Sequence, residues 1–310
     1  MTLSHPVFFT IHYPRITIHF RCMGIIDFIL NLAGLLLWLN WRSLRFDPLG
    51  RRTPATLIGT LRRAEPRRLR RWHLPAVLGG LLFLRAVFYW QIGSGVGWAA
   101  GKLNLGVIEL SFRSDYFGDI LLFSLCSFGL TLGVFYLWLL LFSILAGPEP
   151  FHRLVRMQLG PIDRLPRGVK FILPLVLVAP LWWLASWLLA WLAIVPQPVS
   201  AMHRIEESLV IGLGSYLAWK FAAGALLVLH LLNSYIYFGR YPFWNYVTAE
   251  AQTLLRPLHA APLRTGKADF APVVGIALIF LLAHIAQYGI PLPWEYKIPG
   301  LEDIYTKLPF

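Results

Sequence analysis

At 310 residues, with 57% hydrophobic side chains and only 14% charged ones, this chain has the composition of a membrane protein. A mean hydropathy of +0.61 agrees with that class. The net charge of +13 does not indicate a nucleic-acid partner, because the basic residues lie in the gaps between apolar runs. The two cysteines, Cys22 and Cys126, form neither a disulfide framework nor a metal-ligand spacing.

Residues 1–22 come before the first apolar run and lack the ordered basic, apolar and small-residue regions of a signal peptide. A second methionine, Met23, directly opens that run. We interpret residues 1–22 as an N-terminal extension. Translation starts at Met1 or at Met23, and we favour Met23.

Six apolar runs are each long enough to cross a bilayer, which takes about 20 helical residues. They lie near 24–41, 74–92, 119–146, 171–194, 208–238 and 270–290. In hydrocarbon every backbone amide needs an internal partner, and runs this continuously apolar do not alternate as barrel strands do. We therefore predict an all-α, polytopic helical membrane protein.

A proline-punctuated pattern occurs three times between these runs and predicts three helical-hairpin repeats. The first prolines are Pro48, Pro150 and Pro242, which are 102 and 92 residues apart, and the last are Pro75, Pro174 and Pro272. We expect each last proline in the first turn of a span and each first proline to end the preceding helix. The predicted segments are 23–92 (repeat 1), 93–118 (external loop, with a hairpin or re-entrant piece near 107–112), 119–194 (repeat 2), 208–290 (repeat 3) and 291–310 (external tail).

Basic residues predict the orientation of the spans in the membrane. Nineteen Lys and Arg lie in segments 42–73, 147–170 and 239–269, whereas seven lie in the other loops and tails. We therefore expect the three proline-patterned segments on the cytoplasmic side and both termini outside.

The cytoplasmic segments combine apolar stripes at helical spacing with arginines, as in Phe151–Leu165 and Phe243–Leu258. This pattern is typical of a helix in the headgroup layer with its apolar face toward lipid. We expect the arginines to contact anionic lipid headgroups. The predicted contact residues are Arg62, Arg63, Arg67, Arg68, Arg70, Arg71, Arg153 and Arg156. The alternative is that these segments are merely basic anchors set by topology.

The third segment carries a family resemblance. Its elements are the aromatic Phe243 after Pro242, the run Leu255-Arg256-Pro257-Leu258, Pro262, and Asp269-Phe270-Ala271-Pro272. In this order they resemble the YggT (YlmG-like) family of bacterial and plastid membrane proteins. The three proline-patterned segments are called copy one (42–73), copy two (147–170) and copy three (239–269). Copy two matches the family pattern more loosely than copy three, and copy one keeps little of it beyond Asp47-Pro48-Leu49.

The resemblance implies a polytopic protein of the bacterial inner membrane with no known catalytic residues. It also implies roles in the assembly of membrane complexes, in division-site or nucleoid-linked organisation, or in osmotic tolerance. Plastid relatives take part in cytochrome maturation. The chain departs from the family in having Tyr241 where an acidic residue is usual, and a third unit where one or two are common.

Ionisable groups inside spans are candidate functional residues. Arg85 lies ten residues beyond Pro75, roughly 15 Å into the bilayer. An arginine at that depth can extend toward Asp27 on the first helix, so we predict an Asp27–Arg85 ion pair.

His230 with Asn233, and His284, are the other strongly polar groups deep in the last two spans. We expect them to form hydrogen bonds between helices. Two imidazoles could instead ligate haem, but their predicted depths differ by about 8 Å, so we expect no cofactor.

No catalytic triad, carboxylate pair or metal cluster can be assembled from this sequence. We predict a non-enzymatic integral membrane protein that organises or helps assemble membrane components, with lipid and membrane-protein partners. The alternative is a small-solute or ion transporter or channel with a pathway lined by Arg85, His230 and His284.

Overall fold

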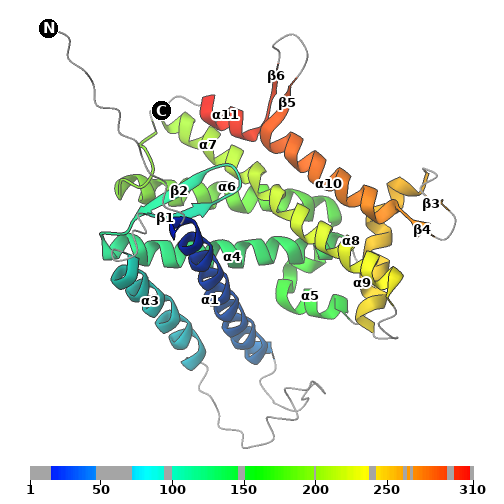
Figure 1. Ribbon diagram of the computed structural model, residues 1–310, viewed down its shortest axis with the longest axis horizontal. Coiled ribbons are helices and arrows are strands. Elements are labelled where there is room, and N and C mark those ends of the chain that lie inside the picture. Colours follow the sequence, from blue (N-terminus) through cyan, green and yellow to red (C-terminus); the bar gives the residue numbers. More distant parts are fainter. Residues whose placement is uncertain are drawn as a thin grey trace, which may run out of the picture. The chain divides into compact units, whose positions relative to one another are not determined.

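A computed structural model describes residues 15–46, 72–93, 100–145, 151–198, 200–236, 242–260, 264–265, 268–291 and 297–307 (Figure 1). The long helices are α1 (Arg15–Phe46), α3 (His73–Gly93), α4 (Phe117–Leu145), α6 (Arg167–Trp191) and α10 (Ala271–Tyr288). A further apolar stretch runs through α7 (Ala201–Gly214), the 3-10 turn η2 (Ser215–Ala218) and α8 (Trp219–Tyr235).

These elements supply six helical stretches that are long and apolar enough to cross a membrane, counted over the described residues. Each corresponds to one of the predicted apolar runs. Large apolar side chains such as Phe28, Leu84 and Leu181 are more than half exposed, which is expected where lipid rather than water surrounds the helices. The predicted all-α, polytopic architecture is confirmed.

Shorter elements connect the long helices. Within segment 93–118, β1 (Ala100–Asn104) and β2 (Glu109–Arg113) form a two-stranded hairpin, so of the two predicted alternatives the structure has the hairpin. Copy two contains α5 (Phe151–Leu159) and the 3-10 turn η1 (Gly160–Arg164), and copy three contains α9 (Pro242–Leu255) and η3 (Arg256–Ala260). The remaining pieces are β3 (Arg264–Thr265), β4 (Ala268–Asp269), β5 (Gly289–Pro291), β6 (Lys297–Pro299) and α11 (Leu301–Lys307).

The chain divides into two units. The first contains α1, α3 and residues 113–128, and the second contains residues 102–112 and 129–310. In the first unit α1 packs against α3. Gly34 lies at a close approach there, since a Cβ at this position would stand 2.8 Å from Phe128 Cε2 and 3.3 Å from Leu78 Cδ1.

In the second unit α7, η2 and α8 follow one another end to end (Figure 1). The 35 residues of Ala201–Tyr235 would extend about 52 Å at helical rise, well beyond the roughly 30 Å of hydrocarbon. α6 packs along α7, whereas α10 packs along α8. The continuous stretch of α7, η2 and α8 therefore packs against two different helices along its length.

Surface helix α9 uses its apolar stripe differently from the lipid-facing stripe expected from sequence. Val247, Ala251 and Leu255 are at most 2% exposed and form a core with Leu226 and Leu227 of α8. The stripe therefore contacts protein rather than lipid. The physical reason is that α8 offers a complementary apolar face beside it, which no pattern within α9 reveals.

Within the described part of the chain, the prolines of the pattern fall at helix starts, except for Pro174. Pro75 is the third residue of α3, Pro272 the second of α10, and Pro242 the first of α9. Pro174 was expected in a first turn and instead lies inside α6, because the helix begins earlier, after Pro166 at its N-cap. Pro48 and Pro150 lie outside the described residues, and Pro257 is in η3.

The α6–α7 contact generates a testable prediction at Gly212. A Cβ there would stand 2.9 Å from Leu175 Cδ1 and 3.0 Å from Ala179 Cβ. We expect Gly212→Leu to push the two helices apart at a cost of about 1–3 kcal/mol, measured as a lower thermal midpoint in detergent.

Gly133 of α4 is the matched control, since a Cβ at that position meets no atom within 4 Å. Gly133→Leu should leave the thermal midpoint nearly unchanged. Equal midpoints for the two variants would contradict the close packing of α6 on α7.

Candidate functional site

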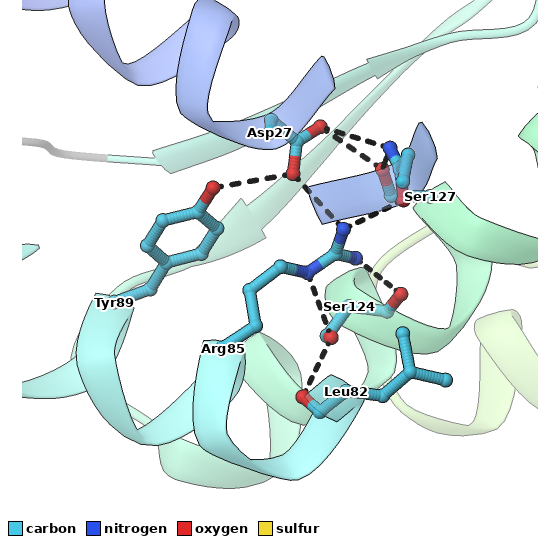
Figure 2. Close-up of polar contacts among 7 residues, drawn as sticks. Asp27, Leu82, Arg85, Tyr89, Ser124 and Ser127 are labelled. Carbon is cyan, nitrogen blue, oxygen red and sulfur yellow. Dashed lines mark hydrogen bonds and ion pairs between the residues drawn. The ribbon is translucent and has the colours of Figure 1, made fainter. Parts of the chain in front are cut away.

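A buried polar network in the first unit surrounds Arg85 of α3, whose side chain is 1% exposed (Figure 2). Arg85 Nη1 lies 3.2 Å from Asp27 Oδ1 and donates to Asn31 Oδ1 at 2.7 Å. Its Nε donates to Ser124 Oγ at 2.9 Å, and its Nη2 donates to the Ser124 carbonyl. The predicted Asp27–Arg85 ion pair is therefore confirmed.

Besides Arg85, other side chains also contact Asp27. Tyr89 Oη donates to Asp27 Oδ1 at 3.2 Å, and Ser127 Oγ donates to Oδ2 at 3.0 Å. The Asn31 amide lies 3.5 Å from the same Oδ2 and donates to Ser127 Oγ at 2.9 Å. These bonds join α1, α3 and the first half of α4 through one buried network, which we call the Arg85 cluster.

Helical spacing explains how three apolar helices present these groups together. Asp27 and Asn31 are four residues apart on α1, Arg85 and Tyr89 are four apart on α3, and the two serines are three apart on α4. Residues three or four apart share one helix face. Sequence reasoning found Asp27 and Arg85 but missed Asn31, Tyr89, Ser124 and Ser127. Polar pairs at this spacing within apolar runs were the available signal.

The Arg85 cluster is a structural network whose charged groups bond to one another. The guanidinium uses Nε, Nη1 and Nη2 on groups of its own chain. A buried charge is tolerated only when it is paired and hydrogen-bonded, and here both conditions hold. The arrangement therefore stabilises the packing of three helices rather than holding an open cationic site for a solute.

A second buried network lies in the second unit, around Asp163 of η1, which is 8% exposed. Ser143 Oγ donates to Asp163 Oδ1 at 2.5 Å, and Lys170 Nζ lies 3.6 Å from the same oxygen. Arg156 Nε donates to Oδ2 at 3.1 Å, and His152 Nε2 lies 3.5 Å from it. This Asp163 cluster joins the end of α4, α5, η1 and the start of α6.

Electrostatics favour the ionised form of this acid. Burial of the carboxyl acts to raise the pKa of Asp163, but the hydrogen bonds from Ser143 and Arg156 and the charges of His152 and Lys170 lower it by more. The net result is a pKa below its usual value.

A third polar group lies midway along α7. Glu207, 3% exposed, accepts from Trp182 Nε1 at 3.2 Å and from Tyr305 Oη at 3.4 Å. The pKa of Tyr305 is raised by burial and then by the charge and hydrogen bond of Glu207. These bonds fasten α11 to α7 and α6.

The predicted histidines are not brought together. Gly224 of α8 faces Phe280 of α10, and Gly275 of α10 faces Leu227 of α8, so the two helices are antiparallel. His230 and His284 lie toward opposite ends of this contact, about 15 Å apart along the axes at helical rise, which does not suit one haem iron. Asn233 Nδ2 donates to Thr248 Oγ1 of α9 at 3.3 Å, as expected for a bond between helices.

His284 is exposed and its ring lies 4.7 Å from that of Tyr288, while His230 is half-buried. Among the predicted lipid-contact arginines, Arg153 is exposed and Arg156 belongs to the Asp163 cluster with its side chain 56% exposed. Arg62, Arg63, Arg67, Arg68, Arg70 and Arg71 lie outside the described residues. Over the residues that are described, no three His, Cys, Asp or Glu side chains form a metal-binding group.

The fold and these networks define a polytopic helical membrane protein. Comparisons with protein-family models, with curated proteins and with solved structures return no match to this chain.

The Arg85 cluster generates a prediction about stability. Removing one partner of a buried ion pair leaves the other charge uncompensated, which costs about 3–5 kcal/mol. We therefore expect Arg85→Leu and Asp27→Leu each to lower resistance to unfolding in detergent strongly. The double variant should be less destabilised than the two single effects added together.

Lys220→Leu is the control, because Lys220 lies over the Phe221 ring at 5.2 Å and a cation there contributes far less. Additive effects of the Asp27 and Arg85 substitutions would show that the two side chains do not act as a pair.

The Asp163 cluster predicts a specific pH dependence. Because the folded-state pKa of Asp163 is lowered, its ion pairs contribute stability above the unfolded-state pKa of about 3.9. That contribution is lost as the pH falls through the folded-state pKa. The thermal midpoint of Asp163→Asn should therefore be well below that of the wild type at pH 7, and the gap should close below about pH 4.

The exposed Asp115 provides the comparison. Asp115→Asn should shift the midpoint little at either pH. A gap for Asp163→Asn that stays constant from pH 7 to pH 3 would contradict the ion-pair explanation.

Proposed function

We propose that this protein is a non-enzymatic scaffold of the bacterial inner membrane that organises or helps assemble other membrane components. The observation that carries the proposal is the Arg85 cluster. Its intramembrane charges bond to one another and to neighbouring polar groups of the same chain. Charges used in this way stabilise a fixed arrangement of helices, which suits a platform for partner proteins.

The order of elements supports a repeated unit. Copy two runs α4, α5, η1, α6, and copy three runs α8, α9, η3, α10. In both, a long helix is followed by a short helix, a 3-10 turn and another long helix. We propose that this is the YggT-like unit suggested by the third copy, and that the basic segments face the cytoplasm and contact anionic lipid.

A transporter or channel linked to osmotic tolerance is the alternative. It would need polar groups facing one another along a pathway. Arg85 is 2% exposed and saturated by its own chain, while His230 and His284 lie at opposite ends of the α8–α10 contact. The geometry therefore favours the scaffold.

Affinity purification from native membranes tests the proposal. We expect a defined membrane-protein partner to co-purify with the intact protein. Because the Arg62–Arg71 run is the most basic part of the chain, replacing its six arginines with glutamine should release that partner while the protein remains in the membrane fraction.

Solute flux into proteoliposomes that contain the purified protein tests the transporter alternative. The scaffold predicts no solute flux above that of empty vesicles. Flux that is abolished by an Arg85 variant shown to be folded, together with no partner in the native membrane, would favour transport and overturn the proposal.

A further inference from the structure

The Asp163 cluster carries more positive charge than its own acid neutralises. Arg156 and Lys170 both lie within ion-pair distance of the one carboxylate, at 3.1 Å and 3.6 Å. His152 adds a third basic group at 3.5 Å. At least one positive charge is therefore left over, and charge balance would be completed by an anion.

That excess charge is accessible on Arg156. Lys170 is buried, with its side chain 7% exposed, whereas the side chain of Arg156 is 56% exposed. The bond to Asp163 uses Nε, and a guanidinium offers two further nitrogens, Nη1 and Nη2, in a planar fork that suits a phosphate group. Asp163 thus holds the guanidinium in place and leaves its phosphate-binding edge available.

The surroundings of Arg156 resemble a membrane surface site. Leu154, Met157 and Leu165 are each at least 36% exposed on the same short segment. Arg164 and Arg167 are exposed beside them. An apolar and cationic surface at the entrance of a span suits a lipid, whose phosphate meets the arginines while its chains meet the leucines.

Copy three lacks this combination. Both short helices bury part of their apolar stripe, Val155 and Leu159 in α5 and Val247, Ala251 and Leu255 in α9, so the difference lies in the charged groups. Arg256 of η3 is exposed, and no acid–base ion pair is seen at Arg256 among the residues that the structure describes. The contrast identifies copy two as the segment with a preorganised arginine.

We propose that Arg156, positioned by Asp163, binds the phosphodiester of an anionic phospholipid headgroup where α5 and η1 meet α6. This inference rests on the membrane-surface role in the proposed function and names the lipid site within it. The exposed leucines favour a lipid over free phosphate as the source of the anion.

The test is native mass spectrometry of the full chain in detergent, titrated with phosphatidylglycerol and separately with phosphatidylcholine. We expect the wild type to prefer phosphatidylglycerol. Arg156→Gln should weaken phosphatidylglycerol binding about five-fold, which corresponds to one arginine–anionic lipid contact. Arg256→Gln, the matched control in copy three, should change it by less than two-fold.

Asp163→Asn separates a built site from simple charge attraction. It raises the net positive charge, so attraction alone would strengthen phosphatidylglycerol binding. Loss of the Asp163 anchor should instead weaken it. Inorganic phosphate at the lipid concentration should not displace the lipid.

Three results would overturn the proposal: equal binding of the two lipids, unchanged binding by a folded Arg156→Gln protein, or stronger binding by Asp163→Asn. Thermal midpoints confirm that the variants are folded, with Arg156→Lys as the milder substitution. Partner co-purification is scored on the same preparations. Loss of lipid preference with the partner retained, or the reverse, shows which of the two proposals fails.

Discussion

The requirement that polar groups find partners where water is absent governs this structure. Arg85 satisfies it through Asp27, Asn31 and Ser124, and Asp27 is held in turn by Tyr89 and Ser127. In water such bonds would compete with solvent, but in hydrocarbon the alternative is an unsatisfied charge. Three helices are therefore joined at one level.

The second unit meets the same requirement in a different way. Its buried acids gather side chains from several helices: Asp163 those of α4, α5 and α6, and Glu207, midway along α7, those of Trp182 and Tyr305. Elsewhere the helices pack through small residues. Gly212 against α6 and Gly224 against α10 allow the close contact that replaces the hydrophobic effect as the force between helices in lipid.

These two kinds of contact bear on function. In the first unit the network uses its charges internally and fixes three helices, whereas the second unit presents exposed arginines and leucines near a span. Within the second unit the Asp163 cluster has two effects. It ties the surface helix to the spans, and its excess charge remains on Arg156.

The sequence by itself determined the spans, because a continuous apolar run of about 20 residues has only one stable form in lipid. It also determined the Asp27–Arg85 pair, since two opposite charges inside adjacent spans have few other partners. The predicted position of Pro174 in a first turn was wrong, because α6 already begins at Arg167, directly after Pro166 at its N-cap.

Only the tertiary structure decided which polar residues complete the clusters and which apolar stripe meets protein. Ser124 and Asn31 become partners of Arg85, and Ser127 a partner of Asp27, only when three helices pack. The stripe of α9 has the pattern of a lipid-facing helix, yet it meets α8. Both depend on contacts between residues far apart in sequence, which helical periodicity does not encode.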